Sequence, residues 1–387
     1  MKKILKISTM LACTAFFVWQ CSKDDSGIEP VEPVDPSGQD TTSQDTVPAI
    51  PQGEEPHPDS VAKYAGLRAW KATAGLPQTF VWFDDWVGTV ATSKTSMRSL
   101  PDSLTIISNW GQPKWPLTAT RKTEMKYMQK VKGTKVVVTL FSQKCGDDVT
   151  PTGETPDPIY SIGNSADIAV IGPAIKKYAE AIYDLVIENG YDGYDWDYEP
   201  QGGGGTNPLW QTPTQRKLFV EELSYWFGEG ATDPARDRGG RKAVSRSLLF
   251  LIDGEIGIRG RMDKDWLSYY VDYFVLQAYG GGNLQGRVSG VIEDMSDWIS
   301  AGRITKEEVV SRTILTEDFE SYATTGGGVL NMSSYIHTAD GVDQQIGGFG
   351  IYRIGMDYQG TTKQYKFLPQ GIANIYSIYN TRKQQQQ

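Results

Sequence analysis

The sequence predicts an α/β fold, a single (β/α)8 barrel of the TIM type. Eight short runs rich in apolar and β-branched residues recur along the chain, and several are almost continuously hydrophobic, as strands buried on both faces are. Helical patterns or long loops separate these runs, which is the order of elements that a parallel barrel requires. The expected strands are 80–83, 104–108, 135–141, 193–199, 247–252, 273–279, 313–316 and 348–354.

Three of the connections carry clear amphipathic helical patterns, at 166–188, 214–227 and 286–299. In the first of them apolar residues repeat at helical spacing, and Asn189-Gly190 form a typical C-terminal stop. A doubly wound sheet is the rival fold. It requires a Gly-rich phosphate turn after an early strand, and the sequence has none.

The N-terminal segment has the composition of an export signal. Lys2, Lys3 and Lys6 precede an apolar run, ISTMLACTAFFVW, that is short for a membrane span. The run ends at Cys21, and acidic residues follow. The segment resembles a bacterial lipoprotein signal with Cys21 as the lipidated residue, and the acidic residues resemble the surface-export signal of gut Bacteroidetes lipoproteins. We therefore expect a lipid-anchored protein at the bacterial cell surface, on the outer membrane. An ordinary signal peptide or membrane anchor, with a periplasmic or secreted location, is the alternative.

Composition divides the rest of the chain into a tether and one folded domain. The segment after Cys21 is rich in Pro, Asp, Glu, Ser and Gly, which predicts disorder. Cys145 is the only cysteine beyond the signal, so the folded domain has no disulfide and depends on a sizeable core. We expect the signal at 1–21, the tether at 22–60, the barrel at 61–380 and a frayed tail at 381–387.

Charge and reactive side chains limit the partners of the protein. The net charge of −9 argues against nucleic acid, which requires a basic face. Two histidines argue against a histidine-rich metal site, and neither is placed to form a recognisable nucleophile pair with Cys145. We expect no metal and no cofactor. Eleven Trp and twenty Tyr offer faces that stack on sugar rings, although a large core also uses them.

An acidic segment, YDGYDWDYEP, occupies the fourth expected strand. Alternate residues of a strand face the same way, so Asp195, Asp197 and Glu199 share one face while the aromatic residues between them share the other. With the acids inside the barrel, Glu199 lies nearest its C-terminal mouth. Neighbouring carboxylates about 6.6–6.8 Å apart do not all ionise freely, so at least one pKa should be raised, as a general acid requires. A calcium site or a solvated acidic loop is the alternative.

The same residues resemble a known family. DGYDWDYE matches the DGxDxDxE signature of glycoside hydrolase family 18, and the resemblance covers the whole expected barrel. It implies retaining hydrolysis in which the substrate's own N-acetyl oxygen is the nucleophile and an oxazolinium ion the intermediate. In that mechanism Glu199 is the acid and then the base, Asp197 orients the acetamido group, and Asp195 shares a proton or hydrogen bond with Asp197.

The sixth expected strand indicates one branch of this family. Chitinases of the family usually carry M-x-Y-D here, whereas LQAYGG contains a Gln-x-Tyr pair that resembles the endo-β-N-acetylglucosaminidases. Gln277 and Tyr279 are two positions apart, so on a strand they share a face. By resemblance Tyr279 is catalytic and hydrogen-bonds the acetamido oxygen, while Gln277 supports the same sugar. A tyrosine buried in the core is the alternative reading of Tyr279.

Further substrate contacts are predicted around the mouth. Tyr352 takes the place of the Trp that chitinases carry on strand eight, and Trp82 and Glu317 are placed at the ends of two other strands. The glycine-rich loop 201–210 borders the mouth and either grips glycan antennae or is a plain loop.

Together these features predict an endo-β-N-acetylglucosaminidase that hydrolyses the GlcNAc-β1,4-GlcNAc bond in the core of N-glycans on glycoproteins. A chitinase or chitodextrinase with the same mechanism is the first alternative. A glycan-binding barrel without catalysis is the second. We expect a monomer that contacts the membrane only through its N-terminal lipid.

Overall fold

The structure of the chain is a computed structural model. It describes residues 55–88, 94–111, 116–151, 153–161, 167–199, 212–242, 244–257, 266–360 and 364–385. The expected signal, Cys21, most of the expected tether and the loop 201–210 lie outside these ranges. Within them, no helix combines the length and the apolar character that crossing a membrane requires.

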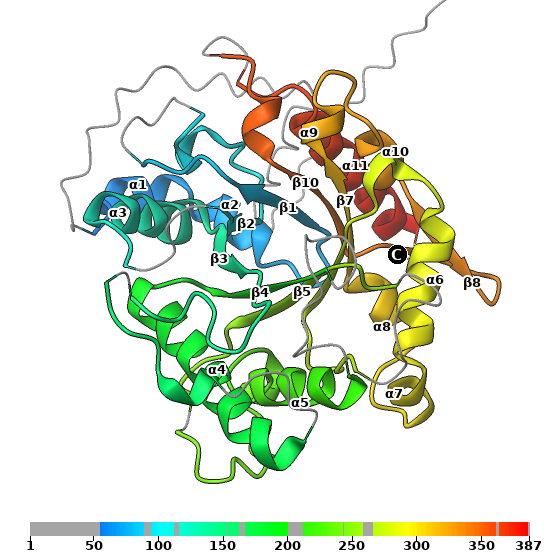
Figure 1. Cartoon of the computed structure of the whole chain (residues 1–387). Helices are drawn as coiled ribbons and strands as arrows, with labels where there is room; N and C mark the ends of the chain where they lie inside the picture. The colour runs from blue at the N-terminus through cyan, green and yellow to red at the C-terminus, as the bar shows by residue number, and fades with distance from the viewer. Residues whose placement is uncertain are drawn as a thin grey trace, which may run out of the picture. The chain divides into compact units, whose positions relative to one another are not determined.

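Eight parallel strands of the described chain close into a barrel, in the order β1-β10-β7-β6-β5-β4-β3-β2 (Figure 1). Each predicted strand is found within a few residues of its expected place, so the predicted (β/α)8 fold is confirmed. The barrel strands are β1 (Gln78–Phe83), β2 (Ile106–Asn109), β3 (Lys135–Leu140), β4 (Gly193–Tyr198), β5 (Leu249–Gly254), β6 (Tyr273–Leu276), β7 (Thr313–Asp318) and β10 (Gly348–Tyr352).

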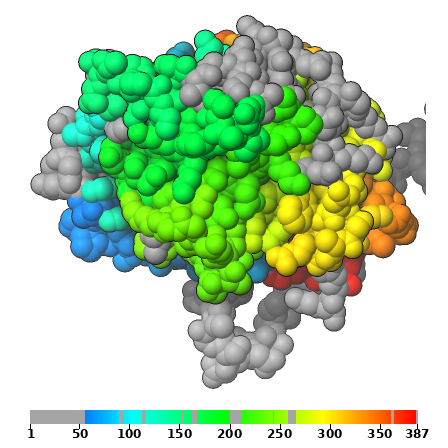
Figure 2. Space-filling view, turned by 60° about the horizontal axis from the view of Figure 1, so that its bottom comes forward, coloured from blue at the N-terminus to red at the C-terminus, as the bar shows by residue number. Residues whose placement is uncertain are grey.

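Helices surround the barrel and shield the outer face of its sheet. Figure 2 shows one side of the molecule, where the green segments of α4 and α5 lie beside the yellow segment of α6. The helices are α1 (Pro58–Lys63), α2 (Ala65–Lys71), α3 (Ala119–Tyr127), α4 (Ile168–Asn189), α5 (Pro213–Leu223), α6 (Leu284–Asp294), α7 (Ser296–Ser300), α8 (Lys306–Ser311), α9 (Phe319–Tyr322), α10 (Val329–Ser333) and α11 (Leu368–Gln385). The three predicted helices correspond to α4, α5 and the pair α6–α7.

Local sequence signals explain where α4 and α5, on either side of β4 in the chain, begin and end. The Asp167 side chain accepts the backbone N–H of Ala169 and caps the start of α4, and Gly190 ends it with a φ of 82°. Thr212 forms a capping box with Gln215 at the start of α5. The chain therefore enters β4 directly from a terminated helix.

Regular structure extends beyond the range 61–380 expected for the barrel. Helix α1 begins at Pro58, and α11 continues to Gln385, where Arg382 donates a hydrogen bond to the backbone oxygen of Asp343. A short antiparallel hairpin, β8 (Ile336–Ala339) and β9 (Val342–Gln345), precedes β10 and was not predicted. Its strands, IHTA and VDQQ, are only four residues long, which is too short for a periodic pattern to identify them.

The barrel separates two apolar cores. Seven buried side chains fill its interior, Phe80, Trp82, Ile106, Val137, Leu251, Val275 and Ile314, and a larger core lies between the sheet and the helices. The aromatic residues of β4 belong to the outer core, as predicted. The ring of Trp196 packs edge-on against Phe219 of α5 at 4.8 Å between centroids. This packing leaves the other face of β4 for the barrel interior.

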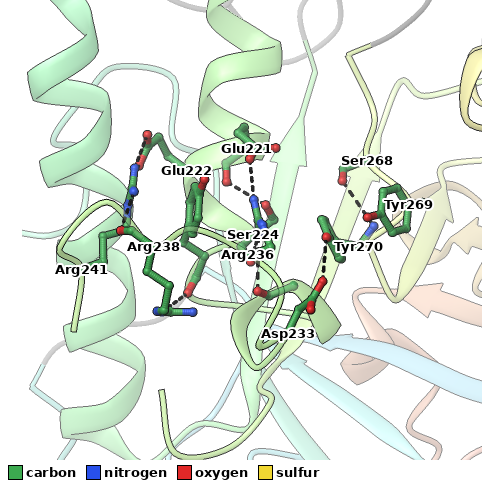
Figure 3. Close-up of polar contacts among 12 residues, drawn as sticks. Glu221, Glu222, Ser224, Asp233, Arg236, Arg238, Arg241, Ser268, Tyr269 and Tyr270 are labelled. Atoms are coloured by element: carbon green, nitrogen blue, oxygen red, sulfur yellow. Dashed lines mark hydrogen bonds and ion pairs between the residues drawn. The ribbon is translucent and has the colours of Figure 1, made fainter. Parts of the chain in front are cut away.

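Three arginines attach the segment 229–242 to the end of α5 (Figure 3). Arg241 donates two hydrogen bonds to Glu222, at 2.6 and 2.5 Å, and its guanidinium lies 3.9 Å from the ring centroid of Tyr225. Arg236 pairs with Glu221 and bonds the backbone oxygen of Ser224. Arg238 donates hydrogen bonds to the backbone oxygens of Ala231, within the segment, and of Tyr225, just after α5. The cluster precedes β5 and so holds the entry to that strand.

The two glutamates of this cluster provide a matched stability test. Glu222 and Arg241 are about nine-tenths buried, so Glu222→Gln leaves a buried guanidinium uncompensated. We expect the free energy of unfolding to fall by about 3–5 kcal/mol. Glu221 is 45% exposed, so water screens its charge, and Arg236 keeps its bond to the Ser224 oxygen; Glu221→Gln should therefore cost less than Glu222→Gln. Urea unfolding followed by circular dichroism measures both, and equal losses would contradict the assignment.

Candidate active site

The acids of β4 point into the barrel, as the alternation predicted. Asp195 is fully buried and Asp197 is 5% exposed, and Glu199 follows the last residue of the strand, where it is half-buried. Asp195 contacts residues of two other strands, which places its side chain inside the barrel. The acids therefore run from the barrel interior to the C-terminal mouth.

Asp195 is held by donors from β1 and β3. Its Oδ2 accepts a hydrogen bond from Trp82 Nε1 at 3.0 Å and another from Thr139 Oγ1 at 2.8 Å. The hydroxyl of Ser108 on β2 bonds Thr139 in turn, at 2.5 Å. Trp82 was predicted to contact substrate, but its side chain is 2% exposed and lies within the barrel core. Its ring points into the barrel, and its Nε1–H holds Asp195 in place.

Asp253, at the end of β5, belongs to the same site and was missed from the sequence. It pairs in register with Asp197, is 1% exposed, and interacts electrostatically with Asp195. Asp253 is therefore a third buried acid beside Asp195 and Asp197. The expected strand ended at 252, one residue short of this acid. A carboxylate that ends an apolar strand at the mouth of a barrel was the available signal.

Burial governs the protonation of this pair. It raises the pKa of Asp195 to about 6, although hydrogen bonds with Thr139, Asp253, Trp82 and Ser108 oppose the shift. Burial and then the charges of Asp195 and Asp197 raise the pKa of Asp253 well above its ordinary value. The two carboxyl groups therefore hold a proton more tightly than isolated carboxyl groups do.

Gln277 connects Asp253 to Glu199. Its Nε2 donates to Glu199 Oε1 at 2.5 Å and to Asp253 Oδ1 at 3.3 Å. β6 ends at Leu276, so the predicted strand 273–279 is too long. The backbone turns at 279–281, where Gly280 has a φ of 76°. Gln277 and Tyr279 therefore do not share a strand face, although both lie at the mouth.

Glu199 has the electrostatic setting of a general acid. Burial raises its pKa, the negative charge of Glu255 raises it further, and the Gln277 hydrogen bond partly opposes both. Glu255 follows Gly254 at the end of β5, and its backbone N–H bonds the oxygen of Tyr198. A carboxyl group with a raised pKa at a barrel mouth is suited to donate its proton to a bound substrate.

An aromatic wall lies beside the acids, formed by Tyr279, Tyr352 and Trp110. The rings of Tyr279 and Tyr352 are stacked with centroids 6.2 Å apart, and Trp110 meets Tyr352 edge-on at 5.0 Å. All three residues are half-buried. Trp110, at the end of β2, was missed from the sequence. Burial, followed by the charges of Asp253, Asp197 and Glu199, raises the pKa of Tyr279 well above its ordinary value, so its phenol remains a hydrogen-bond donor.

Glu317 does not face the mouth, and its predicted contact with substrate is corrected. It is fully buried, and its Oε1 accepts the backbone N–H groups of Gly280 and Asp318, both at 2.8 Å. Its Oε2 accepts the N–H of Gly328. A Cβ at Gly327 would lie 2.4 Å from that oxygen, so the loop must carry glycine to approach so closely. Glu317 thus ties the turn after Tyr279 to the segment after β7.

Two other features of the described residues lie apart from this site. A cavity of about 850 Å³ opens at the starts of the strands, among Gln78, Lys135, Leu249 and Tyr273, and none of the acids lines it. Within the described ranges no three His, Cys, Asp or Glu side chains are placed as ligands of a metal ion.

Comparison with known proteins places this geometry in a family. No curated protein sequence matches the chain. Among solved structures, a selenomethionine form of BT1044 with a glutamate-to-glutamine substitution has a TM-score of 0.62 and 24% identity, covering 84% of this chain and 95% of that one. An endo-β-N-acetylglucosaminidase from Cordyceps militaris, in apo form, has a TM-score of 0.52 and 16% identity, covering 84% and 98%. Both likenesses show a shared barrel fold. The family model "Glycoside hydrolase family 18, BT1044-like" matches residues 40–374, and the chain therefore belongs to glycoside hydrolase family 18.

Proposed function

We propose that this glycoside hydrolase is an endo-β-N-acetylglucosaminidase that cuts the GlcNAc-β1,4-GlcNAc bond in the core of N-glycans. The observation that carries the proposal is the contact of Gln277 with Glu199, because this glutamine stands where chitinases of the resembled family usually have methionine. An amide at this position both orients the acid and leaves its oxygen for a sugar.

The fold neighbours support the same substrate class. A second structure of the Cordyceps militaris enzyme, with a TM-score of 0.50 and 16% identity over 81% of this chain and 95% of that one, is a complex with fucosyl-N-acetylglucosamine-Asn. That protein carries an Asp-to-Asn and a Glu-to-Gln substitution two positions apart. Asp197 and Glu199 have the same spacing and the same residue types.

In the proposed first step, Glu199 gives its proton to the oxygen that links the two GlcNAc residues. The bond from that oxygen to the anomeric carbon breaks, while the N-acetyl oxygen of the substrate forms a new bond to the same carbon. The product is an oxazolinium ion, so no protein nucleophile is needed. Asp197 holds the acetamido N–H and balances its developing positive charge, and the Tyr279 phenol donates to the acetamido oxygen.

In the second step, Glu199 is anionic and takes a proton from water as the water attacks the anomeric carbon. The oxazolinium ring opens, and the configuration at that carbon is retained. The Gln277 amide N–H donates to Glu199 in both steps and stabilises its anionic form between them. The tyrosines of the aromatic wall offer ring faces for the sugar.

Replacing the acid tests both the reaction and the substrate. The full chain should remove glycans from a high-mannose N-glycoprotein and leave one GlcNAc on each asparagine, as intact-mass spectrometry detects. Glu199→Gln should lower kcat by about 10²–10⁴-fold, because the amide has no proton to give yet still accepts the Gln277 hydrogen bond.

Chitotetraose is the control substrate for that assay. If the mass of high-mannose, hybrid and complex glycoproteins stays unchanged while chitotetraose is cut, the protein is a chitinase. If neither is cut but glycans still bind, the barrel is a binding protein.

The pH dependence of the reaction tests the electrostatic setting of Glu199. Glu255→Gln removes a negative charge that raises the pKa of Glu199, so that pKa should fall. The alkaline limb of kcat/KM reports the general acid of the free enzyme and should move to lower pH. Glu307→Gln, which removes the same charge from an exposed helix start, is the control and should leave the limb in place. A shift toward higher pH, or none, would show that another group governs the limb.

We also propose that the chain is anchored at the outer membrane through a lipid on Cys21, which lies outside the described residues. The basic start, the apolar run and the following acidic residues support this proposal. Cells expressing the chain with labelled palmitate should yield labelled protein in the membrane fraction, and Cys21→Ser should abolish the label. Label retained by the serine variant would overturn the anchor.

A further inference from the structure

Asp253 is buried near three other acids at the mouth of the barrel. Asp195, Asp197 and Glu199 of the β4 segment act on it electrostatically, and it acts in turn on the Tyr279 phenol. Its side chain is 1% exposed. No cation of the described chain is hydrogen-bonded to it. A fully ionised cluster at this depth would place like charges side by side with little water to screen them.

The hydrogen bonds of Asp195 and Asp253 require one proton between them. Asp195 Oδ2 has two donors, Trp82 and Thr139, but Asp195 Oδ1 has none within the described chain. Asp253 Oδ1 has the Gln277 amide, and Asp253 Oδ2 has no donor there. Each carboxyl group therefore has one buried oxygen without a donor in the described chain. A hydrogen on either of these two oxygens would satisfy both, because one carboxyl group would then donate to the other.

The donors decide which carboxyl group is neutral. Asp195 receives two good hydrogen bonds from uncharged groups, which stabilise an anion. Asp253 receives a single longer bond of 3.3 Å. The proton therefore belongs to Asp253, whose Oδ2–H donates to Asp195 while its carbonyl Oδ1 accepts Gln277. Burial raises the pKa of both carboxyl groups, which agrees with a proton retained on the pair.

We propose that Asp253 is a positioning residue that works as a neutral acid, tying the buried Asp195 to Gln277 and, through Gln277, fixing Glu199. The inference rests on the proposed function only for the identity of the bond that Glu199 cleaves. Asp253 touches no reacting atom. Its neutral form links β4, β5 and β6 by hydrogen bonds while adding no charge beside Asp197 and Glu199.

Two substitutions separate a neutral donor from an ionised carboxylate. Asp253→Leu removes both hydrogen bonds, frees Gln277 to rotate, and should lower kcat by about 10²-fold with a smaller effect on KM. Asp253→Asn keeps a donor for Asp195 and an acceptor for Gln277, so it should recover most of that loss. The assay uses the full chain and whichever of the glycoprotein or chitotetraose it cleaves, with melting temperatures to verify folding.

A folded Asp253→Asn variant that is as slow as Asp253→Leu, or slower, would overturn the inference, because an ionised carboxylate would then be required. If the leucine variant does not fold, the comparison of Asp253→Asn with the unchanged chain decides alone, and a loss of about 10²-fold overturns it. Equal activity of all three chains would also overturn it.

Infrared spectroscopy tests the proton without any substrate. At pH 8 ordinary Asp and Glu side chains are ionised, and the full chain should retain the carbonyl band of a protonated carboxylic acid. Asp253→Asn should remove that band, whereas Glu199→Gln, the matched control, should leave it. If the full chain shows no such band, or if Asp253→Asn retains it, the inference is wrong. A chain that cleaves neither substrate would refute the proposed function and leave this measurement valid.

Discussion

The close pairing of β4 with β5 is the contact on which the site depends. A Cβ at Gly193 would lie 2.3 Å from the backbone oxygen of Leu249, and one at Gly254 would lie 2.2 Å from that of Tyr198. Glycine thus stands at both ends of the pair, where the two backbones approach most closely. Between these ends the register sets Asp197 opposite Asp253. A shift of one residue would turn every acid of β4 into the outer apolar core.

The acids at the mouth are costly to bury, and the barrel offsets that cost with donors from several strands. Trp82 of β1 and Thr139 of β3 both bond Asp195, and Gln277 after β6 bonds Glu199 and Asp253. No single loop supplies these groups. The barrel strands therefore hold these groups in place. Such positioning suits a reaction in which the same carboxyl group first donates a proton and later accepts one.

Sequence reasoning succeeded where the signal is local and failed where it depends on packing. The alternation in β4 predicted which acids face the interior, because a strand has a period of two whatever surrounds it. The position of Asp253 beside these acids was not predictable, since it depends on the register between β4 and β5. Trp82 and Glu317 were assigned to substrate from their positions at strand ends. Their burial follows from which way each strand turns, and that is a property of the closed barrel. The early end of β6 was hidden for a similar reason, because the turn at Gly280 is stabilised by Glu317, a residue 37 positions away.

That carboxylate has a consequence for how the enzyme can diversify. Glu317 bonds the backbone of Gly280 on one side and of Gly328 on the other, so two segments from different βα units share one buried carboxyl group. A change in the length or path of either segment displaces the other, and with it the tyrosine that begins the first. Altered specificity is therefore expected to arise through paired changes in both segments. In a laboratory library that varies only one segment, most variants would have a displaced Tyr279.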